Sequence, residues 1–323
     1  MSSSEERGTE DVTQISVLAS MLLLTVTVER DQSDGDEIHL HPGGQGVWVA
    51  RAIRSLGAGV AIVAPVGGET GAVVEGLLRQ ADLDLRAVRV APATPAYIHD
   101  RRSGTRRPVA AARSRSLDRH ELDNLYEHFL YGAAEDGLVV VTGRADGCGL
   151  PPSFYRRLGS DLDAAGVRVV GDLHNQELYA FLEGGPLEVL KVSDEDLAGD
   201  GESIDDDAAV DCCLDRLHGL GARAVVISRA DNPSRAVWGG VRYEAIGPRM
   251  KTADARGAGD AMTGALAVAV ARKLHPADAL ALASGAGAAS VTRHGLASVD
   301  APLIAAMADR ISVRVVGECR CDV

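Results

Sequence analysis

Short valine-rich segments alternate with helical segments along most of this chain, and this alternation constrains the fold more than any other feature. The segments "LVVVTG", "GVRVVGDL", "VLKVS" and "RAVVIS" have the length and residue types of buried strands. Helical stretches such as "PSFYRRLGSDLDAAG" and "DAAVDCCLDRLHGLGA" separate them. Repeated units of this kind predict a doubly wound α/β fold, in which a mostly parallel sheet carries helices on both faces. Ligands of such folds bind beyond the carboxyl ends of the strands, so we expect the chemistry in the turns that leave those strands.

Two segments break the alternation. Residues 25–42 contain an Asp-Gly turn followed by the alternating "EIHLH", and residues 93–116 are turn-rich and strongly basic. The second segment contains "AYIHDRRSGTRRPVA", which predicts a hairpin that turns at Ser103-Gly104. Together the two segments predict a small second sheet that forms a lid over the end of the main one. The other predicted parts are a disordered tail over residues 1–11 and a main α/β domain over residues 12–24, 43–92 and 117–323.

The charge balance argues against a polyanionic partner. The chain has 323 residues and a formal net charge of −13, so its overall field repels nucleic acid. An acidic protein that handles phosphates must concentrate positive potential locally. The apolar run from Ile15 to Val28 is shorter than the ~20 residues that a membrane span needs, and acidic residues precede it where a signal peptide has basic ones. We therefore expect buried strands in this run, no membrane segment and a cytoplasmic protein.

A run of small residues ends in a carboxylate in "DARGAGDAMTGALAVAV", residues 254–270. Gly257, Ala258 and Gly259 lie between an extended segment and an apolar helix. The free N–H groups and partial positive charge of a helix start attract anions, and glycines let a ligand approach the backbone. Asp260 falls in the first turn, where we expect its carboxylate to stay ionised and to accept a proton from a hydroxyl. This arrangement fits phosphoryl transfer, and in isolation it equally fits a tight turn with an N-cap.

Two further segments also place glycines or acidic residues directly before or at the start of a predicted helix. "HPGGQGVWVARAIRSLGA" is a second glycine cluster that enters a second helix. In "LEVLKVSDEDLAGD", Lys191 ends a strand and is followed by Ser193, Glu195 and Asp196. Acidic groups in this place can hold a hydrated magnesium ion, and the same residues also fit a capped helix start with an acidic first turn.

In chain order these segments resemble the phosphofructokinase B family of carbohydrate kinases, within the ribokinase-like superfamily. "DARGAGDAMTGALAVAV" is similar to the family's C-terminal signature, and "PGGQGVWVARAIRSLGA" with "PVGGETGAVVEGLLRQADLDL" is similar to the N-terminal one. "VVVTGRADGCGLPPSFYRRLGSDLDAAGVRVVGDL" and "KVSDEDL" resemble the 1-phosphofructokinase and tagatose-6-phosphate kinase branch. "ALASGAGAASVTRHG" is similar to the family's helix on the adenine side. The matches run from about residue 15 to about residue 300, and the ordered set is more specific than any one motif.

The resemblance implies a ribokinase-like fold and a kinase that uses ATP and Mg2+ to phosphorylate a hydroxyl of a small molecule, a sugar or sugar phosphate. It makes Asp260 the base, and the turn of Gly257, Ala258 and Gly259 the anion hole. Gly43 and Gly44 are implied to contact the acceptor. The residues that fall in ATP-side positions are Lys191, Ser228, Arg229, Arg256, Ala283 and Gly287. Ser193 and Asp196 take the positions of residues that are associated with magnesium through water. The family also implies a homodimer that forms through the lid.

The chain departs from the family pattern at the acceptor side. Gln45 and Trp48 stand where many sugar kinases of the family have Lys and Asn. The early strand lacks the Asp that binds sugar hydroxyls, and an apolar residue or Thr25 takes its place. Pro95 follows Thr94 where the phosphosugar branch has an Arg. Each change removes a polar contact, so the family's known sugars do not carry over directly.

Other side chains can replace those contacts. His39 and His41 precede the glycine cluster, and the lid carries His99 followed by Arg101 and Arg102. We hypothesise that His99 or the nearby arginines hold an anionic acceptor. The alternative is that these residues form a solvated, charged hairpin.

Two other functions stay open. The acceptor can be a nucleoside or another small alcohol, because Trp48 and the missing sugar contacts leave room for a ring. The third interpretation is a degenerate kinase fold that acts as a ligand sensor. The intact Gly-Ala-Gly-Asp sequence argues against a sensor, because a sensor has no need of a base.

Overall fold

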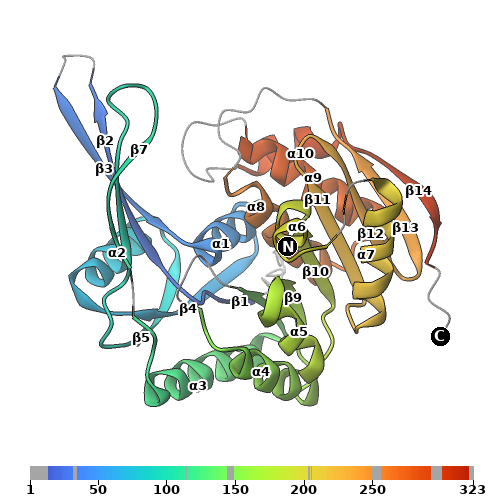
Figure 1. The fold of residues 1–323 in the computed structure, drawn as a ribbon, viewed down its shortest axis with the longest axis horizontal. Helices are drawn as coiled ribbons and strands as arrows, with labels where there is room; N and C mark the ends of the chain where they lie inside the picture. The colour runs from blue at the N-terminus through green and yellow to red at the C-terminus, as the bar shows by residue number, and fades with distance from the viewer. Residues whose placement is uncertain are drawn as a thin grey trace, which may run out of the picture.

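The computed structural model describes residues 14–31, 35–113, 115–143, 149–202, 204, 206–248, 256–291 and 300–319. Within these ranges the chain forms a ten-stranded sheet, helices on both of its faces and a separate four-stranded sheet (Figure 1). The predicted fold class, a mostly parallel sheet with a small second sheet, is confirmed. The predicted disordered tail over residues 1–11 lies outside the described residues.

The large sheet has the strand order β14-β13-β12-β11-β10-β9-β8-β1-β4-β5. From β11 to β5 in this order the strands pair in parallel, and β12, β13 and β14 add antiparallel strands at one edge. The parallel strands are β1 (Gln14–Leu18), β4 (Gly59–Val66), β5 (Asp84–Arg89), β8 (Leu138–Thr142), β9 (Arg168–Asp172), β10 (Val189–Ser193) and β11 (Ala224–Arg229). The antiparallel edge consists of β12 (Asn232–Trp238), β13 (Val241–Ile246) and β14 (Ser312–Glu318).

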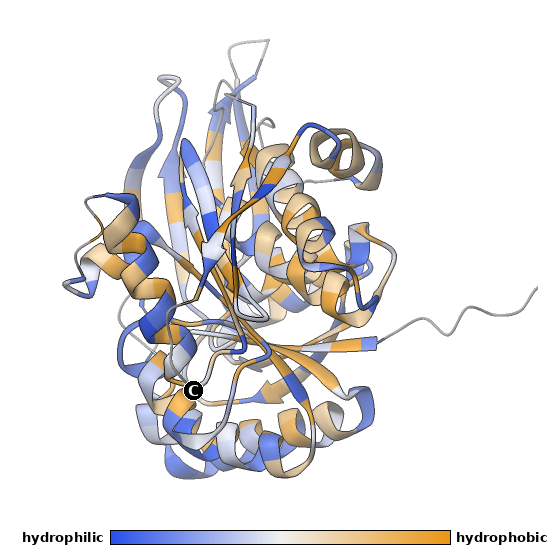
Figure 2. Ribbon diagram, turned by 90° about the vertical axis from the view of Figure 1, so that its right-hand side faces the viewer, coloured by the Kyte–Doolittle hydropathy of each residue, from blue (hydrophilic) through white to orange (hydrophobic). Residues whose placement is uncertain are grey.

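Successive side chains of the central strands point to opposite faces of the sheet, so each strand contributes to two cores. In β8, for example, Val140 belongs to one core while Val139 and Val141 belong to the other. The helices on the first face are α1 (Gln45–Ser55), α2 (Gly68–Gln80), α8 (Ala258–Ala271), α9 (Pro276–Val291) and α10 (Ala301–Ala308). The helices on the second face are α3 (Arg119–Asp136), α4 (Pro152–Ala164), α5 (Asn175–Gly184), α6 (Asp194–Gly199) and α7 (Asp207–Gly219). Figure 2 shows that hydrophobic residues dominate the central strands.

Within the described ranges, none of the helices combines the length and the apolar character that crossing a membrane requires.

The four-stranded sheet, called the lid sheet below, has the order β3-β2-β6-β7 and projects from the main body (Figure 1). Its strands are β2 (Leu23–Arg30), β3 (Asp36–Gly43), β6 (Ala96–Asp100) and β7 (Arg107–Ala112). The apolar run from Ile15 to Val28 therefore contributes strands to two different sheets. The division of the chain into a main domain and a lid at residues 25–42 and 93–116 stays a prediction, because a sheet boundary does not by itself define a domain boundary.

Helices α1 and α8 pack with almost no side chain between their backbones. A Cβ added to Gly264 of α8 would lie 2.7 Å from both the Ala52 Cβ and the Val49 carbonyl oxygen of α1. Such a contact leaves room only for glycine, since the neighbouring atoms belong to a helix backbone and to a buried alanine. The two helices therefore hold a fixed position relative to one another, and both begin at the same edge of the sheet.

We predict opposite effects for two glycine-to-alanine substitutions. Gly264→Ala should lower the free energy of unfolding by about 1–3 kcal/mol, because the new methyl group overlaps α1. Gly76→Ala is the matched control in helix α2, where nothing lies within 4 Å of an added Cβ. It should raise the free energy of unfolding by about 0.5–1 kcal/mol, because alanine is the better helix former. Urea unfolding measures both, and equal effects of the two variants would contradict the packing argument.

Candidate active site

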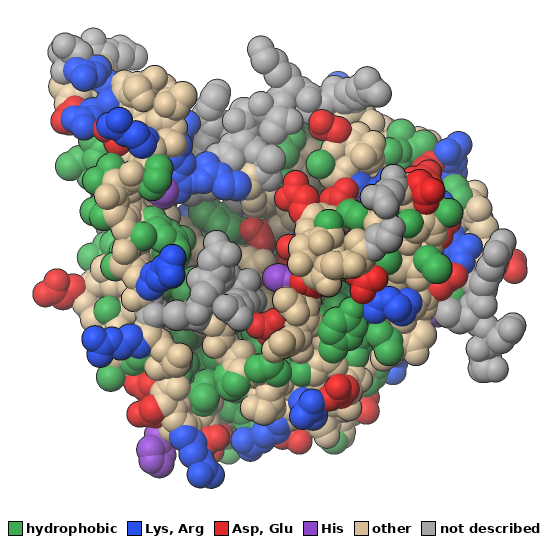
Figure 3. Space-filling view, viewed as in Figure 1, with side chains coloured by type: hydrophobic (Ala, Val, Ile, Leu, Met, Phe, Trp, Pro, Cys, Tyr) green, Lys and Arg blue, Asp and Glu red, His purple; other side chains and the backbone are tan. Residues whose placement is uncertain are grey.

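The candidate site lies where several parallel strands end and helix α8 begins. β9 ends at Asp172, β10 contains Lys191 and ends at Ser193, and Ser193 pairs in register with Ser228 of β11. The carboxyl ends of parallel strands meet at one edge of the sheet, which is the place where the sequence predicts the chemistry. The molecular surface is hollowed here, between the lid sheet and the main body (Figure 3).

The glycine turn before α8 has the form that the sequence predicts. Gly257 precedes the helix with a φ of 81°, a left-handed conformation in which glycine is favoured. The first helical hydrogen bond runs from the Ala261 N–H to the Gly257 carbonyl at 2.9 Å. The preceding N–H groups of Ala258, Gly259 and Asp260 belong to the helix start, where backbone donors have no helical acceptor. The turn thus offers several amide donors beside one carboxylate.

Lys191 brings a positive charge to this turn. The residue is 4% exposed, and its Nζ lies so close to Gly259 that a Cβ on that residue would collide with it. The ammonium group is 3.9 Å from Oδ1 of Asp172, which is also buried. The Thr263 hydroxyl, one turn into α8, donates to Oδ2 of Asp172 at 2.8 Å. A buried lysine is therefore balanced by a carboxylate and lies against the anion hole predicted from the sequence.

Asp172 and Thr263 are not among the site residues predicted from the sequence. The signal for Asp172 was present, because this carboxylate is the last residue of the buried strand "RVVGD" and so stands at the ligand-binding edge. Thr263 gave no comparable signal, since a threonine within an apolar helix is common and its partner lies 91 residues away in the sequence.

The surroundings of Asp260 raise its pKa to about 7. Burial is the largest cause, the negative charges of Asp172 and Asp196 add to it, and Lys191 opposes it. The expectation that the helix start keeps the Asp260 carboxylate ionised is therefore wrong at and below about pH 7. The helix dipole is too weak to offset burial together with two neighbouring carboxylates.

Ser193 and Asp196 form a capping box at the start of α6. The Asp196 N–H donates to the Ser193 hydroxyl at 3.0 Å, and the Ser193 N–H donates to the Asp196 carboxylate at 3.3 Å. The structural alternative raised by the sequence, a capped helix start, is thus present. Their association with magnesium stays a prediction. Among the described residues, no cluster of three or more His, Cys, Asp and Glu side chains could hold a metal ion.

The second glycine cluster lies at the start of α1. Gly44 has a φ of 107°, and a Cβ on it would lie 2.6 Å from the Met21 carbonyl oxygen that follows β1. Trp48 is buried, with its ring 3.5 Å from the Cβ position of Gly43 and the Arg51 guanidinium 4.8 Å from its ring centroid. Gln45 Oε1 is buried and has no hydrogen-bond partner in the described part of the chain. Gln45 thus offers a hydrogen-bond acceptor, while Trp48 is packed against its neighbours, and the contact of both residues with the acceptor molecule stays a prediction.

The residues predicted to contact ATP have several environments. Arg229 is paired with Asp207 at 2.7 Å, and Ser228 beside it is partly exposed. Ala283 and Gly287 are buried in α9. A Cβ on Gly287 would lie 2.9 Å from Met262 in α8, so this glycine lets the two helices approach. Arg256 precedes the glycine turn. The ATP contacts of all these residues stay predictions.

The lid sheet has one polar face. The residues that the strand register places on this face are Thr25, Thr27, His39, His41, Tyr97 and His99. His39 and His41 stack with ring centroids 6.1 Å apart. Both ring nitrogens of His99 are buried without a hydrogen-bond partner in the described residues. Burial, and then the Arg256 guanidinium, lower the pKa of His99, so its imidazole is neutral at pH 7.

Arg101, Arg102 and Arg107 of the lid hairpin pair with acids of the lid itself. Arg102 binds the buried Asp100 at 2.9 Å and Asp36 at 3.1 Å, and Arg101 lies 3.4 Å from Glu29. The hydrogen bonds and charge of Arg102 hold the pKa of Asp100 well below its usual range. The contact of Arg101 with an acceptor stays a prediction, and Arg102 serves the structure of the hairpin.

Comparison with known proteins identifies the family. The model of the pfkB family carbohydrate kinases matches residues 13–302. This chain belongs to the pfkB family. It is therefore an ATP-dependent phosphotransferase of the carbohydrate kinase class.

Two curated relatives of this pfkB-family kinase are phosphofructokinases. ATP-dependent 6-phosphofructokinase isozyme 2 of Escherichia coli (strain K12) is 26% identical over 262 residues, which are 79% of this chain and 82% of that protein. 1-Phosphofructokinase of Xanthomonas campestris pv. campestris is 28% identical over 240 residues, which are 71% of this chain and 73% of that protein. Phosphofructokinase-2 from Escherichia coli in complex with potassium superposes with a TM-score of 0.81 at 22% identity, covering 92% of this chain and 98% of its own. The superposition supports the same fold.

The pKa of Asp260 predicts a pH-dependent stability. Between about pH 4, where an aspartate of the unfolded chain titrates, and about pH 7, the folded state of this kinase binds the extra proton. The free energy of unfolding should therefore fall as the pH rises through this window. Asp260→Asn lacks this proton, so its stability relative to the wild type should increase from pH 4 to pH 7 and then level off. Urea unfolding at pH 5 and pH 8 measures the difference, and a difference independent of pH would show that Asp260 titrates normally.

Proposed function

We propose that this kinase transfers the γ-phosphoryl group of ATP to a hydroxyl of a sugar or sugar phosphate, with Asp260 as the base. One observation carries the proposal: a carboxylate whose pKa is about 7 stands in a glycine-led helix start, next to a buried lysine. A base is most effective when its pKa lies near the working pH. The curated relatives named above, two phosphofructokinases, support a sugar or sugar phosphate as the acceptor class.

The reaction follows from the positions of the groups. The acceptor hydroxyl gives its proton to the Asp260 carboxylate while its oxygen forms a bond to the γ-phosphorus of ATP. The bond between that phosphorus and the oxygen bridging to ADP breaks, and ADP leaves. The amides of Gly257, Ala258 and Gly259 and the ammonium group of Lys191 stabilise the negative charge of the migrating group.

The donor chemistry of the site also fits Mg2+. Asp172 and Asp196 supply the hard carboxylate oxygens that this ion prefers, and both act electrostatically on Asp260. Mg2+ usually keeps several waters and binds substrate phosphates, so a site without a protein cage is compatible with it. When bound, the ion neutralises charge on the ATP phosphates. Ser193 and Asp196 are proposed to act on it through water.

The burial of Trp48 and its packing against Gly43 and Arg51 weaken the case for a nucleoside acceptor, since the ring is already engaged in contacts within the protein. A ligand sensor is disfavoured by the charges at the site. Burying Lys191 and Asp172 and raising the pKa of Asp260 all cost stability, which a binding protein without chemistry does not require.

Turnover of an acceptor panel tests the proposal. Magnesium-dependent ADP release should be found with at least one of fructose 6-phosphate, fructose 1-phosphate, tagatose 6-phosphate, fructose and ribose, and not with adenosine. Asp260→Asn should lower kcat by about 10²–10⁴-fold, because the variant cannot accept the proton. ATP affinity should be retained and serves as the folding control. Substantial activity of Asp260→Asn would refute the role of the base, and ATP binding without turnover of any acceptor would favour the sensor.

We also propose that the kinase forms a homodimer through the lid sheet. The face opposite the histidines is apolar, and Ile38 and Leu40 on it are 65% and 44% exposed. Val26, Val28 and Ile98 share this face by register. An apolar face of this kind is typical of a protein interface. A relative of the same fold, phosphofructokinase-2 from Escherichia coli, has a tetrameric inhibited form, so oligomers occur in this fold.

Charged substitutions on this face should dissociate the dimer. We expect Ile38→Glu combined with Leu40→Glu to weaken self-association at least about tenfold, because the carboxylates lose water in the interface. Sedimentation velocity over a range of concentrations measures the change. Val315→Glu is the matched control, since Val315 is 64% exposed on the distant β14. If both variants behave as the wild type does, the interface lies elsewhere.

A further inference from the structure

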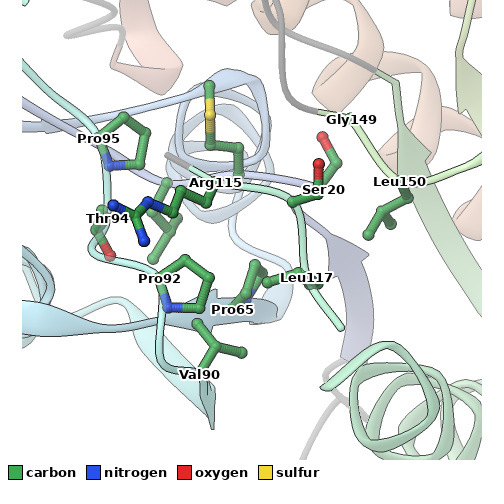
Figure 4. Close-up of a pocket in the computed structure, with 13 residues that line it drawn as sticks. Ser20, Pro65, Val90, Pro92, Thr94, Pro95, Arg115, Leu117, Gly149 and Leu150 are labelled. Carbon is green, nitrogen blue, oxygen red and sulfur yellow. The ribbon is translucent and has the colours of Figure 1, made fainter. Parts of the chain in front are cut away.

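The buried hydroxyl groups around the site differ in what they bind. Ser20 and Thr94 line a pocket at the ends of β1, β4 and β5 (Figure 4), and both of their hydroxyl groups form hydrogen bonds with backbone groups. Thr263 of α8 is fully buried, and its hydroxyl donates instead to the Asp172 carboxylate. A hydrogen bond to a charged group is stronger than one to a neutral group. Thr263 therefore acts on a charged side chain of the site, whereas the other two hydroxyls hold backbone segments together.

The two oxygens of Asp172 have different partners. Oδ2 accepts the hydrogen bond from Thr263 at 2.8 Å, and Oδ1 faces the Lys191 ammonium group at 3.9 Å. The second distance is an electrostatic contact that is too long for a hydrogen bond. The Lys191 Nζ lies instead against Gly259, in the turn that begins α8. The ammonium group is thus placed between the Asp172 carboxylate and the amide donors of the turn.

The Thr263 hydroxyl competes with Lys191 for this carboxylate. A buried ammonium group and a buried carboxylate attract one another strongly, because little water screens them. Thr263 is β-branched and has few side-chain rotamers, and its Oγ1 also lies 3.1 Å from the Gly259 carbonyl oxygen. Its hydroxyl is therefore held in one place at the helix start. Without it, Oδ2 of Asp172 would be buried and unpaired, and the carboxylate would gain most by turning toward the ammonium group.

We propose that Thr263 is a positioning residue, which holds the Asp172 carboxylate on α8 and so keeps the Lys191 ammonium group at the glycine turn. The proposal rests on the proposed function, in which this ammonium group stabilises the migrating phosphoryl group. Thr263 touches neither ATP nor the acceptor in this scheme. It acts through Asp172 on the position of Lys191.

Nucleotide binding without an acceptor tests this assignment. In titration calorimetry, Thr263→Val should weaken ATP binding about tenfold, because the ammonium group moves from the turn toward Asp172. AMP binding should stay within about twofold of the wild type, since AMP lacks the phosphates that reach the turn. Thr263→Ser keeps the hydroxyl and should recover most of the ATP affinity. The ATP loss should be the same with and without Mg2+, because it depends on Lys191.

Ser16→Ala is the matched control. It also removes a buried hydroxyl that donates to a carboxylate, in this case Oδ2 of Asp136 at 2.7 Å. Asp136 ends α3 just before the start of β8, at the opposite edge of the sheet. ATP and AMP affinities should both be unchanged in this variant. Equal losses of ATP and AMP affinity in Thr263→Val, a loss confined to solutions with Mg2+, or no recovery in Thr263→Ser would overturn the proposal.

A double-mutant cycle tests whether Thr263 acts through Asp172. In an Asp172→Asn background the negative charge that attracts Lys191 is absent. Thr263→Val should then cause no further loss of ATP affinity, so the two substitutions should be strongly non-additive. A similar loss in both backgrounds would show that Thr263 acts independently of Asp172 and would contradict the proposal.

Turnover separates this proposal from the proposed function. If an acceptor is phosphorylated and Thr263→Val keeps the kcat and the ATP affinity of the wild type, the kinase function stands and the positioning role fails. If no acceptor is turned over and Thr263→Val still weakens ATP binding but not AMP binding, the kinase function fails and the positioning role stands. Where both hold, Thr263→Val should lower kcat about tenfold and leave the KM of the acceptor nearly unchanged, because Lys191 acts on the migrating group.

Discussion

The constraint on which the rest of this structure depends is that the buried Asp172 and Lys191 lie beside the partly buried Asp260, which brings two carboxylates and one ammonium group together. Burying Asp172 is tolerated because Lys191 and Thr263 contact its two oxygens. For Asp260 the positive charge of Lys191 does not offset burial and the charges of Asp172 and Asp196, and its raised pKa is the consequence. This incomplete compensation makes Asp260 a receptive base near neutral pH. A substitution that relieved the unfavourable burial and charge repulsion at Asp260 would thus also remove the base that the proposed function requires.

The glycines of this site meet a requirement of space rather than of flexibility. Gly259 leaves room for the Lys191 ammonium group, Gly44 leaves room for the carbonyl oxygen of Met21, and Gly264 leaves room for helix α1. Each removes a side chain at a point where two segments distant in the sequence must touch. The two helix starts are positioned by backbone contacts, which vary less than contacts between long side chains.

The sequence alone predicts the parts of this molecule that depend on local pattern. The alternation of strands and helices predicts the parallel sheet, and the glycine turn predicts Asp260 at the start of α8. The pKa of Asp260 could not be predicted, because it depends on side chains from two separate strand ends and from α6. The pairing of the basic hairpin could not be predicted for a related reason. The acids Asp36 and Glu29, which pair with Arg102 and Arg101, lie on neighbouring strands that are far away in the sequence.

Chemistry and recognition are therefore carried by different kinds of contact in this kinase. Phosphoryl transfer needs backbone amides and a few buried charges, and the departures from the family pattern leave those in place. Recognition depends on side chains at the lid and at the start of α1. There Trp48 and Pro95 stand where the family pattern has polar residues, and an apolar residue or Thr25 stands in place of the Asp. The neutral hydrogen-bonding groups that the chain keeps on this side are Gln45 and the polar face of the lid sheet. Each hydrogen bond contributes only modestly to binding, so discrimination among sugars depends on how many of these groups act together.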